Sequence, residues 1–357
     1  MAYTIIDDPS AYFQTLLYTG NASLTALTND GNSDLQPDLI WVKARTNLGG
    51  YFDAIQDTSR GIDKILSVSQ TATELDTSEQ IKSVQSDGFT VGDNSDSNNY
   101  VNLDTYTYVA WQWKANGGTT SSNTNGTITS TVQANTTAGF SIVTYDGTGS
   151  SGATFGHGLG TVPNFIIIKN RSEVKDWAVY HGANTSAPET DALFLNLTDT
   201  TIDNAGYWND TAPTSSIITL GDNTKVNSSG EQHVAYCFTE KQGYSKFGTY
   251  EANASADGPF IYTGFKPAWI LFKNIDNANN WVLHDNKRGA FNVNDEQLSP
   301  NNSNAEATDS AKMDFLSNGF KIRVDAQGVN NSGHTIIYMA FAEHPFVSSE
   351  GVPTTAR

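Results

Sequence analysis

A short apolar phrase that begins with proline and ends with lysine occurs three times in this chain of 357 residues. The copies read PDLIWVK at 37–43, PNFIIIK at 163–169 and PAWILFK at 267–273. Each copy of an internal repeat predicts one supersecondary unit, so a repeat constrains the architecture before any other feature does. Any fold for this chain must therefore place three closely related apolar segments.

A second apolar phrase follows each copy, as YVAWQW at 108–113, HVAYCF at 233–238 and IYMAFA at 337–342. When these closing phrases are aligned on an alanine, they lie at almost the same distance from the opening proline; the alanines are Ala110, Ala235 and Ala340. A Val-Asn pair precedes each closing phrase, at Val101-Asn102, Val226-Asn227 and Val329-Asn330. A tyrosine begins each unit, at Tyr18, Tyr145 and Tyr250. Two phrases held at one spacing three times predict three copies of one folded unit.

The repeated phrases have the composition of β-strands. They are short, rich in β-branched and aromatic residues, and bounded by Gly, Pro, Asn or Asp, whereas a helix needs a longer stretch with 3.6-residue periodicity. Their continuously apolar character is typical of central strands that are covered on both faces. The predicted fold is all-β, with three repeated antiparallel β-sandwich units of Greek-key or jelly-roll type.

The repeat and the local composition predict where the units begin and end. A polar stretch rich in Ser, Thr, Asn and Gly is typical of a flexible linker. The predicted divisions are an N-terminal anchoring segment at 1–17, units at 18–116, 138–241 and 242–346, the linker at 117–137, and a C-terminal tail at 347–357. Because no such linker separates the second unit from the third, we expect these two to pack as a pair and the first to be more independent.

Composition narrows the classes of partner. The chain carries 38 acidic and 20 basic residues, for a formal charge of −18, which argues against nucleic-acid binding. Cys237 is the only cysteine, so an intrachain disulfide is excluded. The N-terminus lacks the features of a signal peptide, and no apolar run is long enough to span a membrane. We therefore expect folding in a cytoplasm without secretory export, and no membrane insertion.

The lysines that end the apolar phrases, Lys43, Lys169 and Lys273, permit two interpretations. A desolvated lysine can serve as a Schiff-base nucleophile or a general base. A lysine at the end of a strand more often extends its ammonium group into water and protects the strand against misassembly. Three copies in three units favour the structural interpretation, because an active site is seldom built in triplicate.

Other candidate sites in the sequence lack a complete pattern. The six histidines show no zinc-binding spacing. Asp53, Asp57 and Asp285 are candidate acids for glycoside cleavage, but nothing in the sequence distinguishes them from other acids. The acidic loop at 93–98 lacks the full EF-hand pattern, and the Gly-rich stretch at 147–160 precedes a strand, whereas phosphate-binding loops follow one. The sequence predicts no enzyme, no cofactor and no metal site.

Several segments resemble a repeat family encoded by tailed bacteriophages of marine bacteria. They include IDDPSAYFQTLLYTGN, AYCFTEKQGYSKFGTY and the closing PFVSSEGVPTTAR, and together with the repeated phrases they cover nearly the whole chain. The resemblance implies a virion structural protein of the tail-fibre-like or head-decorating type, whose partners are other virion proteins. It also implies a protein that folds in the host cytoplasm and leaves it in particles released on lysis. The family has no catalytic residues to transfer.

Three functions compete at this stage. The first is a non-enzymatic protein on the particle surface, either a tail fibre or appendage or a head knob or decoration. The alternative is a carbohydrate- or receptor-binding adhesin module that contacts the host surface; its candidate ligand contact is Trp208, which has no counterpart in the other units and lies in a loop-like stretch. A depolymerase is disfavoured, because the chain lacks the short continuous repeats of a parallel β-helix.

Assembly is left open by the sequence. A homo-oligomer is expected of such a protein, and a trimer is one option, but no heptad segment fixes the number of chains. The segment 1–17, with Tyr12 and Phe13 after an Asp-Pro pair, is expected to anchor the chain to the particle or to a neighbour. Deletion of residues 1–13 is expected to abolish incorporation and to leave the β-sandwiches folded.

Overall fold

The computed structural model describes residues 2–46, 53–77, 80–93, 95, 100–308, 311–325 and 328–354. The protein is all-β and contains several antiparallel sheets, which confirms the predicted fold class at this level. The helices of the described residues are short: η1 (Pro9–Ala11), η2 (Pro188–Thr190) and α1 (Thr224–Asn227). In this part of the chain, none has the length and apolar character that crossing a membrane requires.

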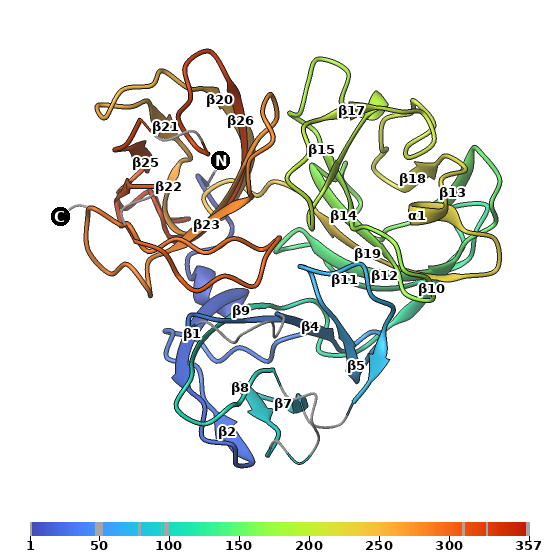
Figure 1. Ribbon diagram of the computed structural model, residues 1–357, viewed down its shortest axis with the longest axis horizontal. Helices are drawn as coiled ribbons and strands as arrows, with labels where there is room; N and C mark the ends of the chain where they lie inside the picture. Colours follow the sequence, from blue (N-terminus) through green and yellow to red (C-terminus); the bar gives the residue numbers. More distant parts are fainter. Residues whose placement is uncertain are drawn as a thin grey trace.

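The strands gather in three lobes around a common centre (Figure 1). We call them the first lobe (residues 13–113), the second lobe (121–238) and the third lobe (245–345). In the first lobe the sheets have the orders β1-β9-β3-β4-β5-β6 and β2-β8-β7. Its strands are β1 (Phe13–Thr19), β2 (Thr25–Leu27), β3 (Leu39–Ala44), β4 (Ala54–Asp57), β5 (Gly61–Leu66), β6 (Leu75–Asp76), β7 (Ile81–Gln85), β8 (Gly88–Val91) and β9 (Thr107–Trp113).

The second lobe has a sheet in the order β10-β11-β12-β19-β14-β15-β16-β17 and a small sheet, β13-β18. Its strands are β10 (Ser121–Asn123), β11 (Ser130–Asn135), β12 (Phe140–Asp146), β13 (Ala153–Gly156), β14 (Phe165–Asn170), β15 (Ala178–His181), β16 (Asp191–Phe194), β17 (Ile202–Asp203), β18 (Ile217–Leu220) and β19 (Gln232–Phe238). In the third lobe the orders are β20-β26-β22-β23 and β21-β25-β24. Its strands are β20 (Ser245–Glu251), β21 (Phe260–Tyr262), β22 (Phe265–Asn274), β23 (Val282–Asp285), β24 (Met313–Leu316), β25 (Gly319–Ile322) and β26 (Thr335–Pro345).

The three apolar phrases that end in lysine form β3, β14 and β22. Each lies inside the larger sheet of its lobe, next to the strand of the closing phrase, and each is antiparallel to that strand. One face of each strand packs into a core within its own lobe, and the other face packs into a core that all three lobes share. The prediction of central strands covered on both faces is confirmed.

Strand register corrects one detail of the sequence alignment. Val42 lies opposite Ala110 and Ile168 lies opposite Ala235, one residue before the lysine in each strand. In the third lobe the residue before the lysine, Phe272, lies opposite Tyr338. The alignment of Ala340 with the other two alanines is therefore wrong by two residues, because a similar apolar pattern hides a shift along the strand.

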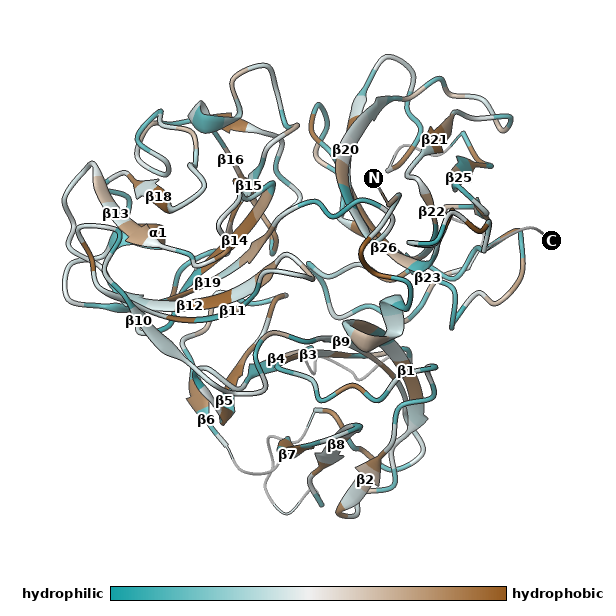
Figure 2. Ribbon diagram, turned by 180° about the vertical axis from the view of Figure 1, so that it is seen from behind, coloured by the Kyte–Doolittle hydropathy of each residue, from teal (hydrophilic) through white to brown (hydrophobic). Residues whose placement is uncertain are grey.

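The shared core joins the three lobes through aromatic rings. Phe13 and Trp113 come from the first lobe, Phe238 from the second and Phe341 from the third. The ring centroid of Phe341 lies 5.2 Å from that of Phe13, 5.8 Å from that of Trp113 and 5.9 Å from that of Phe238. The expectation of a more independent first lobe is wrong, because its sheet contributes the same kind of apolar face to the centre as the others. Figure 2 shows hydrophobic residues along the strands and hydrophilic residues in the outer loops.

The predicted flexible linker at 117–137 is also corrected by the structure. It contains β10 and β11, and β11 pairs with β12 from Thr131↔Thr144 to Asn135↔Phe140. Ser130 and Gln133 are buried, although both are polar residues. The composition misled the prediction because the buried polar side chains of this stretch form hydrogen bonds: Ser130 donates to the carbonyl of Gly156 within the second lobe, and Gln133 donates to Ser59 of the first lobe.

The segment predicted to anchor the chain is part of the folded body. Ile6 and Phe13 belong to the shared core, and Asp7 accepts a hydrogen bond from the backbone of Ser349. Deletion of residues 1–13 would therefore remove core side chains, so the expectation that the sandwiches stay intact does not agree with this packing.

Substitution of Phe13 tests whether the shared core stabilises the whole protein. Phe13 is 3% exposed, and we expect Phe13→Ala to lower the free energy of unfolding by about 3–5 kcal/mol, as large-to-small core substitutions do. The matched control is Phe291→Ala; because Phe291 is 85% exposed, we expect a change within about 0.5 kcal/mol. Urea denaturation measures both, and equal effects of the two substitutions would contradict the packing.

Candidate functional site

The three lysines that end the apolar strands are buried, which contradicts the expectation that their ammonium groups extend into water. Lys43 is 3% exposed, and Lys169 and Lys273 are 0% exposed. Each ammonium group donates to a backbone carbonyl of a neighbouring lobe: Lys43 to Asn302 at 2.6 Å, Lys169 to Thr71 at 3.3 Å and Lys273 to Thr198 at 3.0 Å. The strand ends are covered by a neighbouring lobe, and the lysines donate to carbonyl groups there.

The surroundings of Lys169 and Lys273 explain their electrostatics. Lys169 also donates to the carbonyls of Asn170 and Glu173, and Lys273 donates to those of Asn274 and Asn279. Burial lowers the pKa of each of these two lysines to about 8, and burial also lowers the pKa of Lys43. An ammonium group that is held by carbonyls of two lobes works as a structural cross-link, in agreement with the structural interpretation of the repeated lysine.

Asp57 and Asp285, two of the candidate acids, lie in buried ion pairs. Arg60 Nε lies 2.5 Å from Asp57, and Arg288 Nε lies 2.6 Å from Asp285. Tyr236 of the second lobe donates to Asp57 at 2.8 Å. In the same way, the indole of Trp111 in the first lobe donates to Asp285 at 3.1 Å. Both carboxylates therefore connect neighbouring lobes.

Two further ion pairs extend these connections across the lobe boundaries. Arg60 and Arg171 both contact Glu74, with Arg171 Nη2 at 2.6 Å from the carboxylate. Arg288 and Arg45 both contact Glu306. Asp53, the third candidate acid, accepts from the indole of Trp41 at 2.9 Å and from Ser67 and Ser69. All three candidate acids thus have partners that hold them in the protein framework.

Trp208, the candidate ligand contact, lies in a turn but points inward. Its side chain is buried, its indole nitrogen donates to the carbonyl of Asp191 at 2.8 Å, and its ring packs edge-on against Tyr180. In this arrangement the ring has no exposed face for stacking on a sugar. The sequence placed it in a loop but gave no sign of which way the side chain points.

Four histidines are buried: His157, His181, His233 and His284. The hydrogen bonds of the last three fit neutral rings. His181 lies 3.0 Å from the carbonyl of Tyr338 through Nε2 and accepts from the backbone of Ala183 at Nδ1. His233 and His284 are enclosed in a similar way within their lobes. Burial lowers the pKa of all three rings to about 4. Among the residues that the structure describes, no three His, Cys, Asp or Glu side chains are grouped so that they could hold a metal ion.

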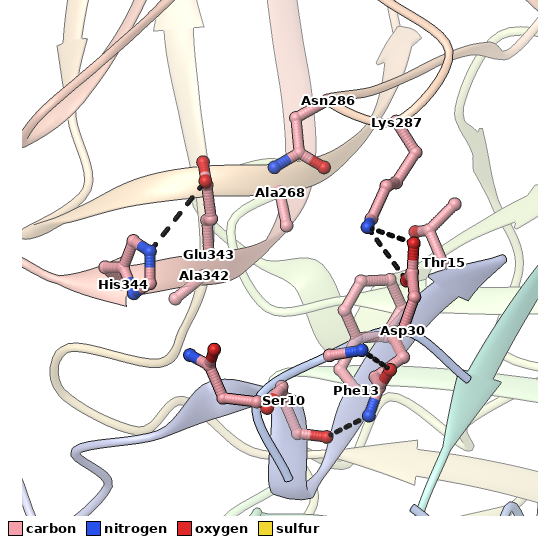
Figure 3. A pocket seen from close by; sticks show the side chains of 13 residues that line it. Ser10, Phe13, Thr15, Asp30, Ala268, Asn286, Lys287, Ala342, Glu343 and His344 are labelled. Carbon is pink, nitrogen blue, oxygen red and sulfur yellow. Dashed lines mark hydrogen bonds and ion pairs between the residues drawn. The ribbon is translucent and has the colours of Figure 1, made fainter. Parts of the chain in front are cut away.

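A cavity of about 210 Å³ lies between the first and third lobes (Figure 3). Its lining comes from two regions that are far apart in the sequence: Ser10, Phe13, Gln14, Thr15, Asp30, Gly31 and Asn32, and Ala268, Asn286, Lys287, Ala342, Glu343 and His344. Sequence reasoning missed this cavity, because only the contact between the lobes brings the two regions together.

The polar groups of the cavity include one without a partner. Lys287 Nζ lies 2.8 and 2.9 Å from the two carboxylate oxygens of Asp30, so the charges of this pair are balanced. Gln14 is held by the carbonyls of Ser10 and Ser33. The hydroxyl of Thr15 is buried and has no hydrogen-bond partner among the described residues. A buried polar atom of this kind costs free energy unless a partner satisfies it.

Two stretches noted in the sequence are placed differently by the structure. The Gly-rich stretch at 147–160 contains β13 and forms part of the small sheet of the second lobe. Most of the acidic loop at 93–98 lies outside the described residues. The Gly-rich stretch is not among the residues that line the cavity.

The family model described as a domain of unknown function (DUF7483) matches residues 8–345. No curated protein matches the chain.

The buried histidines predict a loss of stability in mild acid. The folded-state pKa of about 4 lies below the ordinary value of 6.5, so the unfolded chain binds more protons between these values. The free energy of unfolding must therefore fall as the pH drops from 6.5 towards 4, by about 1.4 kcal/mol per pH unit for each ring. When the free energy of unfolding is measured by urea titration at several pH values in this range, it should fall less steeply with decreasing pH in His181→Gln than in the parent, by about 1.4 kcal/mol per pH unit. Identical pH dependence in the variant and the parent would contradict the neutral assignment.

Proposed function

The chain belongs to the DUF7483 family, and we propose that it is a non-enzymatic structural protein on the surface of a phage virion, where it forms a tail appendage or decorates the head. In this role it binds other virion proteins and contributes to particle assembly or host-surface contact. The observation that carries the proposal is the way in which the three lobes close on one another through equivalent contacts. Two sets of contacts, one inside the lobes and one between them, support it.

The first support is a pattern of hydrogen bonds that recurs inside each lobe. Tyrosine hydroxyls donate to valine carbonyls at 2.6 Å in all three, in the pairs Tyr18–Val101, Tyr145–Val226 and Tyr250–Val329. The asparagine after each valine is buried and accepts from a backbone N–H close after the tyrosine, in Asn102–Asn21, Asn227–Thr148 and Asn330–Asn253, at 3.0, 2.7 and 2.8 Å. These bonds favour three copies of one β-sandwich unit, at 18–116, 138–241 and 242–346, with β10 and β11 added before the second.

The second support is the cyclic order of the contacts between lobes. Each lysine donates to the lobe before it in the chain, and the lysine of the first lobe donates to the third. A backbone hydrogen bond near each lysine joins the same pair of lobes but donates in the opposite direction, from Glu306 to Arg45, from Glu74 to Arg171 and from Thr201 to Ile275, at 2.8, 2.8 and 3.2 Å. A closed cycle of this kind approximates threefold symmetry within one chain.

A body of this kind suits a structural role on a particle. Its side chains at the lobe boundaries are committed to ion pairs and carbonyl contacts, as the candidate acids and lysines show. The net charge of −18 keeps such a protein soluble and discourages contact with packaged nucleic acid. A body with approximate threefold symmetry also fits a threefold position on a virion without requiring three chains.

Purified particles test the proposed function. Phage particles are isolated on a density gradient from cultures that produce this chain, and the fractions are probed with an antibody against it. We expect the chain to co-sediment with the particles at a constant ratio to the major capsid protein, and gold-labelled antibody to decorate intact particles. A soluble host protein serves as the control for carry-over. Recovery of the chain only in the soluble fractions would overturn the proposal.

A further inference from the structure

At the contact between the first and second lobes, a glutamine side chain lies in the position that corresponds to the cavity between the first and third lobes. Gln133 of β11 is buried, and its amide nitrogen donates to Thr58 at 3.0 Å and to Ser59 at 2.8 Å. Its amide oxygen accepts from the backbone of Asn116 at 3.1 Å and of Gly118 at 2.9 Å. One carboxamide thus joins the second lobe to the first lobe and to the segment that follows the first lobe, with four hydrogen bonds.

The residues around Gln133 correspond in position to those that line the cavity. Gln133 lies opposite Ile142 in β12, and Ile142 precedes Tyr145 by the same number of residues as Thr15 precedes Tyr18 in β1. Thr15 lines the cavity and carries the hydroxyl that lacks a partner.

The residues on the opposite wall of the cavity also correspond to residues around Gln133. Thr58 donates its backbone N–H to the carbonyl of Asp38 at 2.9 Å, and Asn286 donates to that of Ala268 at 2.8 Å. Asn286 and Lys287 therefore correspond to Thr58 and Ser59. Asn286 and Lys287 both line the cavity. The cavity between the first and third lobes thus corresponds in position to the carboxamide of Gln133 at the boundary between the first and second lobes.

Two differences leave this place open between the first and third lobes. In the second lobe β11 pairs with β12. In the first lobe the counterpart of β12 is β1, and β1 is the edge strand of its sheet. Asp38 fills part of the first boundary and accepts from Ala115, Gly117 and Gly118, but its counterpart Ala268 has no side-chain acceptor.

We propose that this cavity receives a glutamine or asparagine side chain from an extended segment of a different polypeptide. The volume of about 210 Å³ is below the range of roughly 300–1,000 Å³ that is typical of pockets for whole small molecules. The two carboxylates that line the cavity, Asp30 and Glu343, are each paired with a lysine, Lys287 and Lys266, which favours a neutral polar group as the ligand. A carboxamide both donates and accepts, so it can satisfy Thr15 and Asn286 together.

Residues 1–13 and 346–357 of a second copy do not supply the side chain. Residues 1–13 and 346–357 contain neither glutamine nor asparagine. The inference rests on the repeat proposed above and not on the place of the chain in a particle. Its test uses the purified protein, so failure here and failure of the particle experiment are distinguishable.

The test uses a labelled peptide, STVQAN, that reproduces residues 130–135, and measures its fluorescence anisotropy with the purified full chain. We expect saturable binding, and a loss of about tenfold or more in affinity when leucine replaces the glutamine of the peptide, because two or more hydrogen bonds are removed. The protein variants Ala268→Phe, which fills the cavity, and Asn286→Leu, which removes a polar wall, should weaken binding to a similar extent.

Controls keep the outcome decisive. Ala26→Phe introduces the same side chain at an exposed position of β2 and should leave binding unchanged. Thermal unfolding shows whether Ala268→Phe remains folded, and Asn286→Leu provides an independent answer if it does not. No saturable binding, or binding that is equal for the glutamine and leucine peptides, would overturn the proposal; so would binding that survives both cavity variants.

Discussion

Burial of both faces of β3, β14 and β22 is the constraint on which the rest of the structure depends. A strand that is apolar on two sides needs a second layer on each side. Each lobe supplies one layer from its own smaller sheet and leaves the other face of the strand uncovered. The three uncovered faces meet in the shared core, where Trp113, Phe238 and Phe341 are in contact. Three apolar sheets that meet in this way explain why the lobes form one body.

The polar contacts at the lobe boundaries follow from this packing. When the shared core closes, the strand ends and their lysines are covered by a neighbouring lobe, where water cannot hydrate them. Removing an ion from water costs several kcal/mol, and a hydrogen bond to a charged group returns about 1.5–3 kcal/mol. Lys273 donates to three carbonyls, which is enough to offset the cost and keeps the lysine protonated near neutral pH, since its pKa is about 8. The same logic applies to Asp57 and Asp285, whose arginine partners lie in the same buried networks.

Much of the framework could be predicted from the sequence, because strand identity depends on local pattern. The central strands, the recurring tyrosines and the Val-Asn pairs were all visible, and the structure gives each a defined contact. Burial of the lysines was not predictable, since it depends on the neighbouring lobe and not on residues close in sequence. The polar stretch at 117–137 and Trp208 show the same limit: composition and loop character do not say which side chains point inward. The cavity was beyond sequence reasoning because two distant segments form it.

The shared core makes a direct prediction about cooperativity, and the seven tryptophans can report on it. Trp41, Trp111 and Trp113 lie in the first lobe, Trp177 and Trp208 in the second, and Trp269 and Trp281 in the third. With 5-fluorotryptophan incorporated, fluorine NMR follows each lobe separately during urea denaturation. If one core joins the lobes, all native resonances disappear in a single transition with a common midpoint. Loss of the first-lobe resonances at a urea concentration clearly different from that of the others would contradict the account.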